Sequence, residues 1–308
     1  MKLSIGIVGL PNVGKSTLFK ALTKQEVKIA NYPFVTIDPN VGVVPMPDER
    51  LEKIAKVRGS KEILPAVLEF LDIAGLVKGA HQGAGLGNQF LAHIREVDAI
   101  IHLVRVFKDK EIIHFEVYST SSGQAEPDPV RDFETILEEL RQKDLSSKEQ
   151  VNLLSKKPQV VVLNGEPADV SEELKDKIRK KGFPHLIFDL KNDLSKEDFQ
   201  NLFQAITNLL DLITFYTANE NEARSWFVKK GTKAPQAAGV VHTDFEKKFI
   251  RAEVINWQKL LEASQSSPST SSGQQPNAWA VAKQKGWLRT EGKEYIVQDG
   301  DVIEIRHG

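Results

Sequence analysis

The sequence predicts an α/β protein in which helices cover both faces of a mostly parallel sheet, followed by a small β-rich domain. Three observations support this prediction. Apolar runs alternate with helix-like segments over the first two thirds of the chain, and a glycine-rich turn joins the first run to a helix. Short β-like pieces follow Ile213–Thr217, at Trp226–Lys229, Phe249–Ile255, Lys293–Val297 and Val302–Arg306. Such alternation is typical of parallel sheets, because helices have to cover both faces. We expect two domains, 1–212 and 213–308.

The expected strands of the first domain are short apolar runs. They are Leu3–Val8, Val67–Leu71, Ala99–Val106, Gln159–Leu163 and His185–Leu190. Helix-like stretches follow at Leu18–Leu22, Glu134–Asp144 and Ser171–Lys181. Ser171 is a good N-cap candidate, because acidic residues fill the turn after it.

The turn after the first strand has the spacing of a P-loop. Residues Gly9–Thr17 read Gly-Leu-Pro-Asn-Val-Gly-Lys-Ser-Thr between a strand and a helix, the context that this motif requires. Its backbone N–H groups would cradle a phosphate, helped by the helix dipole. The candidate nucleotide-binding residues here are Asn12, Val13, Gly14, Lys15, Ser16 and Thr17. The alternative is a strand–turn–helix corner with a chance Gly-Lys-Ser.

Candidates for Mg²⁺ and γ-phosphate contacts follow in the order that P-loop proteins use. Asp72-Ile73-Ala74-Gly75 comes directly after an expected strand, which places Asp72 near the metal and the Gly75 N–H near the phosphate. Thr36 lies in the loop before the second strand and is a candidate switch threonine. The predicted metal ligands are therefore Ser16, Thr36 and Asp72.

The group that positions the attacking water is not evident. Leu76 stands where signalling GTPases have a glutamine, and its side chain cannot hydrogen-bond. Backbone groups, a potassium ion or a mobile histidine could replace the glutamine. We take Lys15 and His81 as the candidate catalytic residues, with a solvent-exposed loop histidine as the alternative for His81.

The corner expected to recognise the base departs from the guanine-specific pattern Asn-Lys-x-Asp. The strand Gln159–Leu163 leads into Asn164-Gly165-Glu166-Pro167, which lacks both the lysine and the aspartate. Without that carboxylate guanine loses its discriminating contact, so ATP becomes at least as plausible as GTP. Asn164 could contact the purine, or could belong to a plain Asn-Gly turn.

The C-terminal part carries the positive charge of the chain. Residues 224–308 hold 13 Lys and Arg against 9 Asp and Glu, whereas the whole chain has a net charge of −1. This part is the candidate for binding RNA, with a solvated basic face as the alternative.

Bulk composition excludes several classes. The chain contains no cysteine, so disulfides and cysteine-ligated metals are excluded. It has no apolar run long enough to span a membrane and no secretory signal pattern at Met1–Val8, so we expect a cytoplasmic protein without a membrane partner.

The motifs together resemble the YchF/Obg-like ATPase family over nearly the whole chain. The resemblance rests on Asn12–Thr17, Asn31–Val44, Asp72–Arg95, Arg224–Ala238 and Gln298–Val302. It implies a G-domain-like P-loop NTPase followed by a β-grasp-like TGS domain. It also implies that the protein hydrolyses ATP in preference to GTP and associates with ribosomes.

Two features depart from that family. Only about Pro129–Lys157 stands where the family inserts a long helical hairpin, and Pro167 replaces the glutamate usual in the base-binding sequence. We therefore expect an Mg²⁺-dependent ATPase switch whose C-terminal domain contacts ribosome or RNA. The alternatives are a guanine-specific GTPase and a nucleotide-dependent binding module in which hydrolysis is incidental.

Overall fold

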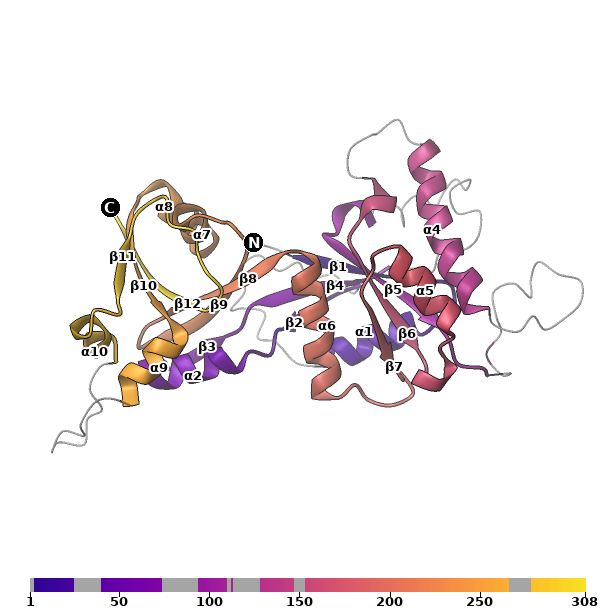
Figure 1. Ribbon diagram of the computed structural model, residues 1–308, viewed down its shortest axis with the longest axis horizontal. Helices are drawn as coiled ribbons and strands as arrows, with labels where there is room; N and C mark the ends of the chain where they lie inside the picture. The colour runs from indigo at the N-terminus through magenta and orange to yellow at the C-terminus, as the bar shows by residue number, and fades with distance from the viewer. Residues whose placement is uncertain are drawn as a thin grey trace, which may run out of the picture. The chain divides into compact units, whose positions relative to one another are not determined.

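The computed structural model describes residues 3–24, 40–73, 94–109, 112, 128–146, 153–265 and 278–308. Two compact units make up the chain (Figure 1). We call residues 2–44 and 68–210 the P-loop unit, and residues 45–67 and 211–308 the C-terminal unit. The second unit thus combines two separate stretches of sequence.

The P-loop unit is built on a six-stranded sheet in the order β2-β4-β1-β5-β6-β7. Its strands are β1 (Ser4–Val8), β2 (Val41–Pro45), β4 (Val67–Asp72), β5 (Ala99–Arg105), β6 (Gln159–Asn164) and β7 (His185–Phe188). Strand β1 runs parallel to β4 and β5, and β6 runs parallel to β5 and β7. Every residue of β5 and β6 is buried, as expected for the centre of a covered parallel sheet.

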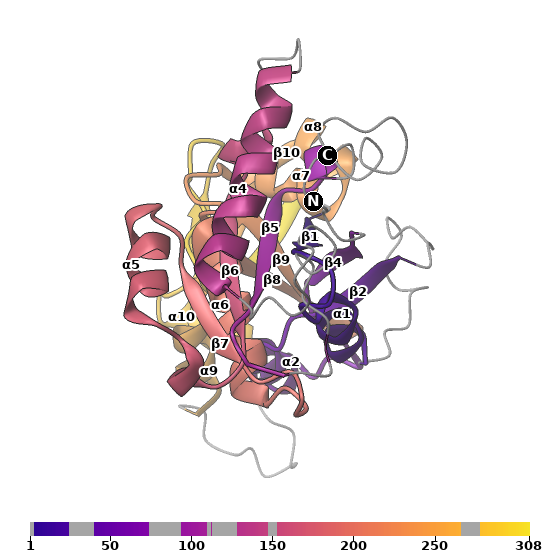
Figure 2. The same cartoon turned by 90° about the vertical axis from the view of Figure 1, so that its right-hand side faces the viewer.

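Helices cover both faces of this sheet (Figure 2). The helical segments are α1 (Lys15–Thr23), α4 (Pro129–Ser146), η4 (Leu154–Lys156), η5 (Pro167–Asp169), α5 (Glu172–Lys180) and α6 (Lys196–Leu209). Residues of α4 and α5 share one apolar core with Val104 and Val161. Phe203 of α6 meets Phe70 of β4 edge-to-face at 6.2 Å, on the opposite face. This arrangement confirms the predicted fold class.

The C-terminal unit has its own six-stranded sheet, in the order β11-β10-β12-β8-β9-β3. The strands are β3 (Glu62–Leu64), β8 (Leu212–Ala218), β9 (Glu222–Lys229), β10 (Phe249–Asn256), β11 (Arg289–Glu291) and β12 (Asp301–His307). The helices are α2 (Glu49–Arg58), α7 (Ala234–Val241), α8 (Thr243–Lys247), α9 (Trp257–Gln265) and α10 (Ala278–Gln284). The unit is β-rich as predicted, but it contains more helix than its sequence indicated.

Two apolar cores lie on the two faces of this second sheet. One combines Phe215, Phe249 and Val254 with α7 and with Phe245 of α8. The other combines Tyr216 and Ile255 with residues of α2, α9 and α10. Neighbouring residues of one strand, such as Phe215 and Tyr216, enter different cores because side chains alternate across a sheet.

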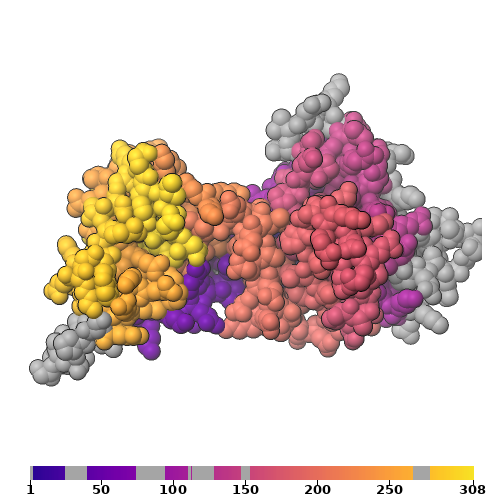
Figure 3. Space-filling model, viewed as in Figure 1, coloured from indigo at the N-terminus to yellow at the C-terminus, as the bar shows by residue number. Residues whose placement is uncertain are grey.

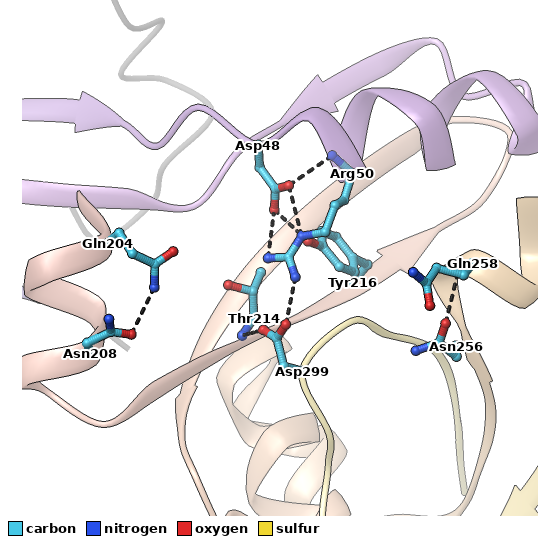
Figure 4. Close-up of polar contacts among 9 residues, drawn as sticks. All are labelled: Asp48, Arg50, Gln204, Asn208, Thr214, Tyr216, Asn256, Gln258 and Asp299. Atoms are coloured by element: carbon cyan, nitrogen blue, oxygen red, sulfur yellow. Dashed lines mark hydrogen bonds and ion pairs between the residues drawn. The ribbon is translucent and has the colours of Figure 1, made fainter. Parts of the chain in front are cut away.

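Residues 45–67 join the C-terminal unit through a partly buried polar network (Figure 4). Asp48 caps α2 by accepting from the Arg50 N–H at 2.9 Å, and it accepts from the Tyr216 hydroxyl at 2.5 Å. The Arg50 guanidinium reaches Asp299 at 2.7 Å, and Asp299 accepts from the Thr214 N–H at 2.9 Å. Burial and the Asp48 carboxylate raise the pKa of Tyr216, which keeps its hydroxyl a donor.

Strand pairing reinforces this attachment. Glu62, Ile63 and Leu64 of β3 lie parallel to residues 222–224 of β9, and the Ala66 N–H donates to the Ser225 hydroxyl at 2.7 Å. Figure 3 shows the violet atoms of this segment against orange and yellow atoms of the same unit. The expected continuous domain 1–212 therefore differs from the two units of the structure, because residues 45–67 belong to the C-terminal unit.

Most expected strands and helices match the structure to within a few residues, and Ser171 caps α5 by accepting from the Leu174 N–H. The strand expected at Lys293–Val297 is wrong. There the structure has a turn closed by the Tyr295 N–H and the Gly292 carbonyl, plus one isolated bridge from Ile296 to Lys233. Among the described residues, no helix is both long and apolar enough to cross a membrane.

Candidate nucleotide site

The loop between β1 and α1 has a backbone that only its glycines allow. A Cβ on Gly9 would lie 2.5 Å from the Leu103 carbonyl oxygen of β5. Gly14 has φ +104°, and a Cβ there would lie 2.7 Å from Nδ2 of Asn164. Asn12 also has a positive φ, 63°, a conformation that asparagine tolerates better than most residues. The loop therefore has the tight turn predicted for a phosphate cradle.

Helix α1 begins at Lys15 with Gly14 as its N-cap. Gly14 offers no side chain to the first N–H groups, and the first turn carries no acidic residue. Its N–H groups and the helix dipole are thus available to an anion. Val13 is buried behind the loop, whereas Ser16 and Thr17 are exposed.

Lys15 is buried at the start of α1, with 9% of its surface exposed. Its ammonium group donates to the Leu10 carbonyl oxygen at 2.9 Å, across the loop. Burial lowers the pKa of Lys15 to about 8, against the opposing effect of the Asp72 carboxylate. A phosphate beside this ammonium group would stabilise its charged form.

Ser16 and Asp72 meet at the carboxyl ends of β1 and β4. Asp72 ends β4 in register with Ile7 of β1, and its Oδ2 accepts from the Ser16 hydroxyl at 3.0 Å. Mg²⁺ prefers oxygen ligands and commonly uses only one or two from the protein, with phosphates and waters completing the set. These two oxygens fit that donor set.

Asn164 ties the site together from the end of β6. Its Nδ2 donates to the Val13 carbonyl oxygen at 2.9 Å, and its Oδ1 accepts from the Leu190 N–H at 3.2 Å. The asparagine thus holds the P-loop to the loop after β7. A direct contact between Asn164 and a purine stays a prediction.

The residues after Asn164 form a small self-capped turn. Glu166 and Asp169 make a capping box around η5, with the Glu166 N–H donating to Asp169 at 3.0 Å. Pro167 has neither an N–H nor a polar side chain. No carboxylate stands at the offset of the guanine-specific aspartate, as the sequence indicated.

Two structural contributors to the site were missed from the sequence. Arg105, 2% exposed, donates to the carbonyls of Phe107, Asp109 and Ile112 at 2.9–3.1 Å and so shapes the loop after β5 beside Asn164. The sequence signal that could have identified Arg105 is an arginine at the end of a mostly apolar run. The role of Leu190 is carried by its backbone N–H, so its residue type gave no signal.

Four residues of interest lie outside the described residues. They are Thr36, Gly75, Leu76 and His81. The predicted roles of Thr36 in metal binding, Gly75 in γ-phosphate contact and His81 in catalysis therefore stay predictions, as does that of potassium.

The strand, glycine turn and helix, with a carboxylate on the neighbouring parallel strand, define a P-loop nucleotide-binding protein. A family model described as "50S ribosome-binding GTPase" matches residues 4–165, and the model YchF-GTPase_C, described as a protein of unknown function, matches residues 212–308.

Similar proteins match over the full chain. The Ribosome-binding ATPase YchF of Bacillus subtilis (strain 168) is 39% identical and that of Mycoplasma genitalium 38%, each over 99% of both chains. The solved Schizosaccharomyces pombe YchF GTPase superposes with a TM-score of 0.77 at 31% identity, covering 99% of this chain and 98% of that one. This chain belongs to the YchF family.

Proposed function

We propose that this protein is an Mg²⁺-dependent P-loop ATPase that works in the cytoplasm and binds the ribosome. The observation that carries the proposal is the convergence of Lys15, Ser16 and Asp72 at the open N-terminus of α1. These groups complement a triphosphate in charge and in hydrogen bonding.

Each residue has a distinct part in the proposed reaction. The loop N–H groups hold the phosphates, and Lys15 leaves the Leu10 carbonyl to donate to the β and γ phosphates. Ser16 and Asp72 would hold Mg²⁺, which when bound neutralises negative charge on the phosphates. Asn164 keeps the P-loop in place through the Val13 carbonyl.

The preference for ATP over GTP is supported by the corner after β6. Both polar atoms of the Asn164 side chain are already bonded to the backbone of Val13 and Leu190, and Asp169 is bonded to Glu166. A pocket without the guanine-directed carboxylate imposes no strong penalty on adenine. GTP is the second candidate, because the similar S. pombe protein is named a GTPase.

Ribosome binding is proposed from the relatives. Both bacterial relatives are named ribosome-binding, and each match spans 99% of both chains. The positive charge of residues 224–308 favours the C-terminal unit as the part that contacts the ribosome.

Calorimetry on the full chain tests the nucleotide proposal. We expect Mg-ATP to bind at least as tightly as Mg-GTP, whereas GTP binding tenfold tighter, about 1.4 kcal/mol, contradicts ATP preference. Asp72→Asn should weaken the Mg²⁺ dependence of nucleotide binding without unfolding the protein. An unaltered Mg²⁺ titration removes Asp72 from the proposed metal site.

Single-turnover hydrolysis with and without ribosomes tests the coupling. We expect ATP hydrolysis by the isolated protein and a change in its rate when ribosomes are added. A protein that co-sediments with ribosomes in the presence of ATP but never hydrolyses it would instead be a nucleotide-dependent binding module.

A further inference from the structure

The helical residues before β5 end at a lysine from a different part of the P-loop unit. Residues 94–96 are helical, and the Lys157 ammonium group donates to the carbonyl oxygens of Arg95 at 2.7 Å and Val97 at 2.6 Å. The last carbonyls of a helix have no partner within it and carry partial negative charge, so they favour a cation. Burial lowers the pKa of Lys157. The two hydrogen bonds attach the end of the helical residues to the segment that leads into β6.

Lys157 itself follows a firmly held segment. The two carboxylate oxygens of Asp144, near the end of α4, accept from the N–H groups of Leu154 at 2.8 Å and Ser155 at 2.9 Å. Leu154 is fully buried, and its carbonyl accepts from the Lys157 N–H at 3.2 Å. The backbone of the lysine is therefore fixed to α4, and its side chain reaches residues 95 and 97 from a defined position.

Val97 packs on β1 next to Ile73, the residue after Asp72. A Cβ on Gly6 of β1 would lie 3.3 Å from Cγ2 of Val97 and 2.5 Å from Cδ1 of Ile73. The two side chains thus share the space over one glycine, and they are 1% and 2% exposed. Because protein interiors are close-packed, a shift of Val97 changes the space that is left for Ile73.

The packing of Ile73 bears on the orientation of Asp72. The Asp72 N–H donates to the Asn40 carbonyl oxygen at 3.0 Å, and its carboxylate accepts from the Ser16 hydroxyl at 3.0 Å. Ile73 is the next residue, so its buried side chain restrains the backbone on the other side of Asp72. Tight metal binding needs groups that orient a ligand as well as the ligand itself.

We propose that Lys157 is a positioning residue for Asp72 and acts through Val97 and Ile73. The contacts form a continuous series from α4 to the carboxylate, which gives a physical basis for coupling between groups that do not touch. This inference rests on the proposed function, because it concerns the orientation of a proposed Mg²⁺ ligand. If Lys157 only stabilised the end of the helical residues, its loss would lower stability and leave the response to Mg²⁺ unchanged.

The first test measures ATP binding to the full chain by calorimetry over a series of Mg²⁺ concentrations. Lys157→Met removes the ammonium group and keeps a long side chain. The Mg²⁺ concentration for half-maximal effect should rise about tenfold, the lower end for loss of a group that supports a metal ligand. ATP affinity without Mg²⁺ should not change, because the P-loop contacts remain.

Two further variants serve as rescue and control in this titration. Lys157→Arg keeps a donor cation and should restore most of the Mg²⁺ response. Lys156→Met, at the exposed neighbouring lysine, should behave like the wild type. An unchanged Mg²⁺ response in Lys157→Met, or an equal change in Lys156→Met, overturns the positioning role.

Hydrogen exchange in the protein without ligand supplies a second readout. Lys157→Met should accelerate exchange of the Asp72 N–H, to which the lysine makes no hydrogen bond, because the backbone around Ile73 is less restrained. The Val161 N–H, which donates to the Pro184 carbonyl oxygen at 2.9 Å, should exchange as in the wild type. Equal acceleration of both N–H groups indicates a general loss of stability and overturns the positioning role.

A double-mutant cycle tests whether the effect passes through Val97. Val97→Ala removes methyl groups over Gly6 and keeps the carbonyl that Lys157 contacts, so it should also weaken the Mg²⁺ response, even if Lys157→Met does not fold. If both residues act on Asp72 by the same contacts, the double variant should lose less than the product of the two single losses. Val161→Ala, in the core shared with α4, is the control. Losses that multiply, or an unchanged response in Val97→Ala, overturn the coupling.

Asp72→Asn distinguishes this inference from the proposed function. If Asp72→Asn leaves the Mg²⁺ titration unaltered, the proposed metal site fails and the positioning role fails with it. If Asp72→Asn alters the titration but Lys157→Met does not, the positioning role alone fails and the proposed function stands. Changes in both variants, with recovery in Lys157→Arg, support both.

Discussion

The polar groups of the P-loop and those around Asp48 differ in what their present hydrogen bonds are for. At the P-loop, Lys15 and Ser16 bond to the Leu10 carbonyl and to Asp72, and the start of α1 has no side-chain cap, so a phosphate can replace these contacts. Around Asp48, the carboxylates, guanidinium and hydroxyl bond to one another and hold residues 45–67 in the C-terminal unit. Buried polar groups that satisfy each other fix structure, whereas groups left with exchangeable partners prepare for a ligand.

The largest expected effect is the loss of stability when the network around Asp48 is broken. Asp48→Ala removes the cap of α2 and leaves the buried Tyr216 hydroxyl without its acceptor, while Arg50 keeps Asp299, and should cost about 2–5 kcal/mol of stability in the C-terminal unit. Tryptophan fluorescence during urea unfolding measures this, because the four tryptophans lie at positions 226, 257, 279 and 287 of that unit. Asp244→Ala, at an exposed carboxylate, is the control, and an equal midpoint for both variants contradicts the proposed anchoring.

A substitution at the P-loop should change the hydrolytic activity and leave the stability unchanged. Lys15→Ala should lower ATP hydrolysis by about 10²–10³-fold, because it removes a cation aimed at the developing phosphate charge. Lys20→Ala, an exposed lysine of the same helix, should hydrolyse normally. The fluorescence midpoint should be unaffected in both variants, and normal hydrolysis by Lys15→Ala would exclude the lysine from the reaction.

A third prediction concerns His102, a buried group of the P-loop unit outside the site. Burial lowers its pKa to about 4 while Gln159 weakly opposes this, and its ring stacks on Phe133 at 5.1 Å. The unfolded state takes up the proton first, so stability is lost as pH falls from about 6.5 to 4, by up to about 1.4 kcal/mol per pH unit. Thermal melts followed by circular dichroism between pH 4 and 6.5 measure the change of stability with pH. This change should be smaller in His102→Leu than in the wild type and the same as wild type in His242→Leu.

The smallest effect should be the pH dependence of nucleotide binding. The pKa of Lys15 is about 8 without ligand, and phosphates favour the charged amine. Above pH 8 the protein must therefore take up a proton on binding, and ATP affinity should fall by up to about tenfold per pH unit. Calorimetry in buffers of different ionisation enthalpy measures this uptake. It should vanish in Lys15→Gln and persist in Lys20→Ala.

The sequence indicated which residues meet at the P-loop better than it indicated the partition of the chain into units. A P-loop and the residue ending the next parallel strand are specified by local pattern, so the sequence alone was enough to bring Ser16 and Asp72 to one edge of the sheet, while their roles as metal ligands stay predictions. Nothing local marks residues 45–67 as belonging with residues 211–308, because β3 pairs with β9 and Asp48 meets Tyr216 far along the chain. Local propensity also failed at Tyr295, whose ring packs into a core without its backbone joining a strand.

The order of strands in the C-terminal unit has a consequence for how the chain is made. Strand β12 is the last element of the sequence, yet it lies between β10 and β8 in the sheet. Until Asp301–His307 emerges during synthesis, β10 and β11 have no partner linking them to β8 and β9, whereas β3 can already pair with β9. Nascent chains fold domain by domain as they appear. Here the P-loop unit can mature first, and only a completed chain closes the second sheet.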